Sequence, residues 1–119
     1  MEMIQETAHS VTMDDVLQSF RACGPLFAAL GDPARQDIIL LLANKERLNV
    51  GQITEAMHLS RPAISHHLKA LLQAGILKME RESRENFYSL DIDPALLIMK
   101  QMIEQVEIVC TERQARLQK

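Results

Sequence analysis

The stretch that decides the fold is Leu59-Ser60-Arg61-Pro62-Ala63-Ile64-Ser65-His66-His67-Leu68-Lys69, which continues to Ala74-Gly75. Ser60 is a typical N-cap and Gly75 a typical left-handed terminator, so we predict a helix from Arg61 to Ala74. Its apolar side chains fall on one side of the helical wheel: Ile64, Leu68 and Leu71, with Leu72 beside them. Its polar side carries Pro62, His66, Lys69 and Gln73. This division predicts a helix that packs by one face and offers the other to a partner.

Cap residues predict three further helices upstream of this stretch. The cap residues of these three helices are Thr12, Asp32 with Pro33, and Asn49 with Gln52. The helix from Thr12 meets Gly24-Pro25, where a proline without an N–H predicts either a kink or a stop and restart. The helix from Pro33 should end near Asn44, and the short helix after Asn49 should end in a tight turn at His58-Leu59.

Downstream, the pattern predicts two strands, residues 76–82 and 86–91, joined by the polar tip Ser83-Arg84-Glu85. A last helix should run from Asp93-Pro94 towards Arg116. Two helices with a tight turn, the second amphipathic, followed by a hairpin, form a winged helix-turn-helix. Such a recognition helix fits the DNA major groove, which is about 12 Å wide. The expected fold is therefore mainly α with a two-stranded β-wing.

We expect one winged helix-turn-helix domain over residues 1–119, because the chain has no linker, repeat or low-complexity segment. Its expected parts are a flexible tail (1–11), dimerisation helices (12–30 and 93–118), a helix-turn-helix (49–74) and a β-wing (76–91).

Five segments, in this order, resemble the ArsR/SmtB family of bacterial winged-helix repressors. They are Leu30-Gly31-Asp32-Pro33-Ala34-Arg35, Val50-Gly51-Gln52-Ile53, the 59–69 stretch, Ala74-Gly75-Ile76-Leu77 and Phe87-Tyr88-Ser89-Leu90. The resemblance covers residues 26–91. It implies a homodimer that binds an inverted-repeat operator in double-stranded DNA and represses transcription.

The candidate DNA-binding residues are Ser60, Arg61, Pro62, Ser65, His66, Lys69 and Arg84. Arg61 and Lys69 can reach phosphate or guanine, and Ser65 and His66 can donate to phosphate or a base edge. Arg84, at the tip of the wing, is expected to enter the minor groove, where the potential is most negative. His67 lies on the flank of the helix, so we expect it to have a structural role.

The last helix carries an apolar stripe that is too broad for a lone surface helix. We expect a two-fold interface with the first helix, which would place two recognition helices about one DNA turn apart. The candidate interface residues are Val16, Phe20, Leu97, Met99, Met102, Ile103 and Val106.

We expect no cofactor and no family-type metal site. One family site uses cysteines at the start of the first helix of the helix-turn-helix, where this chain has Asn49 and Gly51. Another family site uses histidines and carboxylates along the last helix, which here contains no histidine. Glu104 and Glu107 stand three residues apart, but a glutamate pair alone is a poor zinc site, so we interpret them as a solvated face. The sequence indicates no particular small-molecule inducer.

Two alternative functions remain open. Cys23 and Cys110 are either two small buried apolar side chains or a thiol pair that makes the repressor redox-responsive. The chain could also be a winged-helix protein-interaction module without DNA binding, against which its polar and partly basic recognition face argues. An enzyme is not expected, because the sequence has no paired carboxylates, nucleophile–base arrangement or Gly-rich phosphate loop.

The net charge of −3 over 119 residues at first argues against a nucleic-acid binder. The charge is unevenly distributed, however, since residues 60–90 hold five basic and three acidic side chains. We therefore expect modest non-specific affinity and a strong dependence on salt. No apolar run approaches the ~20 residues of a membrane span, and residues 1–10 lack a signal-peptide pattern, so the expected location is cytoplasmic.

Overall fold

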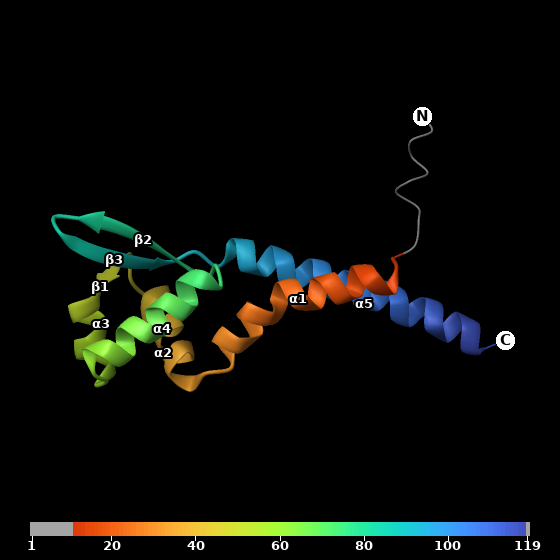
Figure 1. Cartoon of the computed structure of the whole chain (residues 1–119), viewed down its shortest axis with the longest axis horizontal. Helices are drawn as coiled ribbons and strands as arrows, with labels where there is room; N and C mark the ends of the chain where they lie inside the picture. Colours follow the sequence, from red (N-terminus) through yellow and green to blue (C-terminus); the bar gives the residue numbers. More distant parts are fainter. Residues whose placement is uncertain (1–10, 119) are drawn as a thin grey trace, which may run out of the picture. The chain divides into compact units, whose positions relative to one another are not determined.

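The computed structural model describes residues 11–118. The elements are α1 (Met13–Leu30), α2 (Pro33–Ala43), β1 (Leu48–Asn49), α3 (Val50–Met57), α4 (Arg61–Gln73), β2 (Leu77–Glu82), β3 (Glu85–Leu90) and α5 (Asp93–Leu117), shown in Figure 1. The described residues are mainly helical with a small antiparallel sheet, as predicted. They form two compact units, residues 24–97 and residues 11–23 with 98–118. Apart from Val11, the expected tail lies outside the described residues.

The core of the 24–97 unit is built from apolar side chains of every helix in it and from the sheet. Its buried members are Leu26, Ala29, Ile38, Leu42, Ile53, Ile64, Leu68, Leu71, Ile76, Leu77, Tyr88 and Ala95. These side chains recur at helical spacing in α2 and α4, so each helix buries one face and leaves the other exposed. The two helices of the helix-turn-helix, α3 and α4, thereby pack on one shared core.

The predicted caps start the helices. Thr12 and Asp15 bond reciprocally, with Asp15 N–H donating to Thr12 Oγ1 at 3.1 Å and Thr12 N–H to Asp15 Oδ2 at 2.9 Å. Asn49 and Gln52 form the same capping box at α3. The α1 helix runs unbroken past Pro25, so of the two alternatives at that point a stop and restart is wrong.

Left-handed residues end the two helices of the helix-turn-helix. His58 adopts a φ of 58° at the end of α3, in the predicted turn. Gly75 has a φ of +75°, and its N–H donates to the Leu72 carbonyl while the Ile76 N–H donates to the Leu71 carbonyl. This pair of bonds is a Schellman motif, which satisfies the last carbonyls of α4 and directs the chain into β2.

The sheet has three strands in the order β1-β3-β2, all antiparallel. The expected wing of two strands is therefore incomplete, because β1 pairs with β3 through Leu48↔Tyr88 and Asn49↔Phe87. The predicted three-residue tip is also one residue too long. Glu85 already pairs with Glu82, so the turn consists of Ser83 and Arg84.

In the second unit, α1 up to Cys23 contacts α5 from Ile98 onward. Ser19 Oγ donates a hydrogen bond to Gln105 Oε1, and Cys23 Sγ lies 3.8 Å from the Ile98 carbonyl oxygen. Val16, one of the candidate interface residues, is only 9% exposed within the single chain. Its burial shows that the single chain already covers this side chain. Across residues 11–118, no helix combines the length and apolar character that crossing a membrane requires.

Candidate nucleic-acid interface

The α4 helix separates its side chains into a buried face and an exposed face, as its sequence predicts. Ile64, Leu68 and Leu71 are at most 1% exposed. Arg61, Pro62, Ser65, His66 and Lys69 are all exposed, together with the N-cap Ser60. Ser60 Oγ accepts the Ala63 N–H at 3.2 Å and so fixes where the helix begins. The exposed face combines two cations with short hydrogen-bonding groups, which is suited to phosphates and base edges.

A hydrogen bond between side chains ties α4 to α2. Arg35 Nε donates to His67 Nδ1 at 3.1 Å, and His67 is half-buried on the flank of α4. This contact agrees with the structural role that we expect for His67. The sequence does not indicate Arg35 as its partner, because the two residues are 32 positions apart and no spacing rule joins them.

The N-cap of α2 also supports this junction. Asp32 Oδ1 accepts the N–H groups of Ala34 at 2.9 Å and Arg35 at 3.2 Å. The hydrogen bond from the Arg35 amide, followed by that from Ala34, lowers the pKa of the Asp32 carboxyl, and the Arg35 charge acts in the same direction. Asp32 therefore fixes the first turn of α2, which carries Arg35, the residue that bonds His67 of the recognition helix.

The wing tip places Arg84 in a strained, exposed position. Ser83 and Arg84 have φ values of 52° and 69°, both in the left-handed region that non-glycine residues seldom adopt. Two consecutive left-handed residues match the short hairpin turn that follows the natural twist of the strands. The turn holds the Arg84 side chain at the end of the hairpin, where it is exposed as the sequence predicts.

The structure brings Arg61 and Arg84 to one pocket, although 22 residues separate them in the chain. The pocket has a volume of about 160 Å³ and is also lined by Asn49, Val50, Gly51, Glu85 and Asn86. A Cβ added at Gly51 would lie 3.8 Å from Arg61 Nη1, so the start of α3 lies close to the recognition helix here. Two guanidinium groups at one hollow can bind phosphate oxygens with good geometry.

Asn49 is a member of this site that the sequence indicates only as a helix cap. Its Oδ1 accepts the Gln52 N–H at 2.8 Å, while its Nδ2 donates to Glu85 Oε1 at 2.5 Å. The side chain thus joins the start of α3 to the wing. Cap chemistry can be recognised from spacing, but the contact with Glu85 depends on the pairing of β1 with β3.

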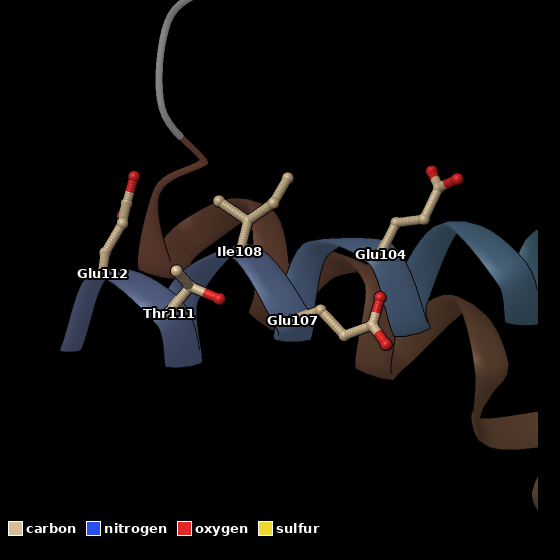
Figure 2. A pocket seen from close by; sticks show the side chains of 5 residues that line it. All are labelled: Glu104, Glu107, Ile108, Thr111 and Glu112. Atoms are coloured by element: carbon tan, nitrogen blue, oxygen red, sulfur yellow. The ribbon is translucent and has the colours of Figure 1, made fainter. Parts of the chain in front are cut away.

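A hollow of about 510 Å³ on α5 is lined by Glu104, Glu107, Ile108, Thr111 and Glu112. Figure 2 shows that all five side chains come from this one helix. The Glu104 and Glu107 carboxylates point to different sides of it. Among residues 11–118, no three His, Cys, Asp or Glu side chains are grouped so that they could hold a metal ion.

The two cysteines lie in different environments of the same unit, and both are free thiols. Cys23 is completely buried, with its Sγ on the Ile98 carbonyl, whereas Cys110 is exposed on α5. The interpretation as two buried apolar side chains therefore holds for Cys23 alone.

Comparison with known proteins agrees with this geometry. Residues 32–78 match the model of the arsR family of bacterial regulatory proteins. A helix-turn-helix-type transcriptional regulator of Methanocaldococcus jannaschii is 36% identical over 84 residues, which are 71% of this chain and 94% of the relative. The transcriptional repressor SdpR of Bacillus subtilis is 38% identical over 66 residues, 56% of this chain and 72% of the relative.

Solved structures have the same fold. An ArsR-like transcriptional regulator from Rhodococcus superposes with a TM-score of 0.71 at 24% identity, covering 86% of this chain and 92% of that one. The transcriptional repressor PagR of Bacillus anthracis superposes with a TM-score of 0.58 at 27% identity, covering 72% and 98%. The family match over residues 32–78 and the relative that is 36% identical, with this fold, show that the chain belongs to the ArsR family of winged helix-turn-helix regulators.

Proposed function

We propose that this protein is a sequence-specific DNA-binding transcriptional repressor that acts in the cytoplasm as a homodimer on an inverted-repeat operator. The observation that carries the proposal is the exposed face of α4, with Arg61, Ser65, His66 and Lys69 opposite a fully buried face. In this proposal α4 enters the major groove, and Arg84 reaches the adjacent minor groove. The relatives named as transcriptional repressors support the same function.

The pocket between Arg61 and Arg84 supports a phosphate contact between the two grooves. Both side chains are exposed, and they come from the recognition helix and the wing tip. A phosphate bound there would fix the register of α4 on the duplex. The side chains of Ser65, His66 and Lys69 would then contact base edges or further phosphates in the groove. This arrangement divides the interface into a positioning part and a base-reading part.

Exposed apolar side chains in the unit formed by residues 11–23 and 98–118 support the dimer. Its large exposed members are Met13, Leu17, Phe20, Ile103, Ile108 and Leu117. Of the other candidate interface residues, Met99, Met102 and Val106 are half-buried in this unit, and Leu97 is 59% exposed in the other unit. Exposed apolar side chains of this size are what an obligate partner would cover.

The test is to select bound fragments from the source genome and to titrate the recovered duplex with salt. The logarithm of the association constant should fall linearly with the logarithm of the salt concentration, with a slope of about −0.9 for each phosphate contacted. A flat response, or no binding at low salt, would refute the proposed function and favour a protein-interaction module. Equal affinity before and after mild oxidation would eliminate redox control through Cys23 and Cys110.

A further inference from the structure

The wing carries as many acidic side chains as basic ones, which is an unfavourable composition for a DNA-binding hairpin. Between residues 77 and 90 the cations are Lys78, Arg81 and Arg84, and the anions are Glu80, Glu82 and Glu85. Carboxylates close to DNA repel its phosphates. A wing that approaches DNA must therefore compensate for its three glutamates.

Strand pairing gathers the three glutamates on one face of the sheet. In the β2–β3 ladder Glu80 lies opposite Phe87, and Glu82 lies opposite Glu85, so their side chains share the face that bears Phe87. Tyr88, the buried neighbour of Phe87, points to the core on the other face. Glu82 and Glu85 are like charges directly opposite one another, an arrangement that destabilises a sheet unless it is compensated.

Arg47 lies across this acidic face. Its guanidinium carbon is 4.1 Å from the centroid of the Phe87 ring on β3, and the group reaches β2 on the far side. There Nη1 is 3.6 Å from Glu80 Oε1, and Nη2 donates a hydrogen bond to Glu82 Oε1. The hydrogen bond to Glu82, reinforced by the charges of Glu82 and Glu80, raises the pKa of Arg47 above its usual range.

The third glutamate is bound by a neighbour of Arg47. Asn49 Nδ2 donates to Glu85 Oε1 at 2.5 Å, so the segment 47–49 contacts all three wing glutamates. Arg84, by contrast, forms no ion pair within residues 11–118. Arg47 supplies one positive charge and Asn49 a neutral amide, so these contacts offset part of the negative charge of the wing and leave the cation at its tip without an ion pair.

We propose that Arg47 is a positioning residue of the DNA interface, which offsets part of the negative charge of Glu80 and Glu82 so that the acidic wing can approach the DNA backbone. The inference rests on the proposed DNA-binding function and adds a residue that acts through other side chains. The ion pairs of Arg47 contribute little to the free energy of unfolding, so folding stability alone does not account for this residue. The Arg47 side chain is 36% exposed and its partners are 66% and 57% exposed, and ion pairs exposed to water contribute little to folding.

The experiment compares the binding of a fluorescein-labelled random-sequence duplex at low salt. The variants are Arg47→Gln, Glu80→Gln/Glu82→Gln, and the triple variant that combines all three changes. Lys45→Gln is the matched control, because it removes one exposed cation from the same loop. We expect Arg47→Gln to weaken binding about tenfold, because Arg47 then no longer offsets the repulsion between the Glu80 and Glu82 carboxylates and the phosphates. The triple variant should return to within about twofold of the parent protein, since it removes the source of repulsion.

Each outcome separates this inference from the proposed function. If the parent protein fails to bind the duplex, the DNA-binding function is wrong and the inference falls with it. If the parent binds and Arg47→Gln binds equally well, or no worse than Lys45→Gln, only the inference is overturned. If Arg47→Gln binds weakly and the triple variant does not recover, Arg47 acts by direct contact or by holding the wing's shape, which also overturns the inference.

Discussion

Lys69 is the residue at which the recognition face can be tested most directly. It is exposed in the middle of α4, directly after the buried Leu68. Its ammonium group needs no other side chain to orient it and can contact a phosphate or a guanine. A change at this position therefore alters the DNA interface while leaving the core unchanged.

Replacing Lys69 with alanine should weaken binding to the selected operator by about tenfold and lower the steepness of the salt dependence by about one unit. The measurement is a fluorescence anisotropy titration at several salt concentrations. Lys100→Ala is the matched control, because Lys100 is also exposed within a helix and its loss changes the net charge equally. Equal losses in the two variants would mean that total charge, and not the α4 face, governs binding.

His67 lies within the recognition-helix motif but helps to hold α4 against α2. Its neighbour His66 is exposed, whereas His67 is half-buried and accepts a hydrogen bond from Arg35. The helical wheel distinguishes the two histidines because they are 100° apart. The wheel cannot identify Arg35, because that contact exists only when α2 packs against α4.

At the scale of single elements, the N-caps determine where the helices begin. Asp32 accepts two backbone N–H groups at the start of α2, and these bonds lower the pKa of its carboxyl. A lowered pKa in the folded state means that the ionised carboxylate stabilises the fold at a pH above the unfolded pKa. This contribution is lost as the pH falls through the folded value.

Asp32→Ala should therefore lower Tm by several degrees at neutral pH, and the difference from the parent protein should shrink as the pH falls below about 4. Thermal unfolding followed by circular dichroism between pH 3 and pH 7 measures this effect. Asp37→Ala is the control in the same helix, because the exposed Asp37 side chain forms no hydrogen bond or ion pair within residues 11–118. A difference that stays constant with pH would show that charge plays no part in the cap.

The wing is the element whose extent the sequence underestimates. Residues 77–90 alternate and turn in a recognisable way, whereas β1 has only two residues, which is too short to show any period. Its pairing with β3 places Arg47 and Asn49 against the glutamates of the wing. An extended segment at Leu48 to Val50 can be predicted locally, but its pairing with β3, on which the electrostatics of the hairpin depend, cannot.

At the scale of the whole molecule, dimerisation should be tested through the unit of residues 11–23 and 98–118. Phe20 and Ile103 are 47% and 50% exposed there, while Val16 is buried within the chain. Exposed side chains are free to contact a partner, whereas a buried one supports the surface from beneath. We therefore choose Ile103 rather than Val16 as the position to change.

Ile103→Glu should shift the mass in solution from twice 13.5 kDa towards 13.5 kDa, because a charge in an apolar interface is costly to desolvate. Multi-angle light scattering after gel filtration measures the change. Leu40→Glu is the matched control, since Leu40 is an exposed apolar residue of α2 in the other unit. A parent protein of 13.5 kDa, or a dimer that survives in the Ile103 variant, would contradict the proposed interface.

The sequence by itself determined the order of the helices and the wing, their caps, and the buried and exposed faces of α4. These features depend on residues within a few positions of one another, such as Ser60 with Ala63 or Leu72 with Gly75. Only the tertiary structure decided that Arg61 and Arg84 share a pocket, that Arg35 supports His67 and that Arg47 compensates the wing glutamates. The physical reason is distance along the chain, because these contacts join residues 23 to 35 positions apart and form only when separate elements pack together.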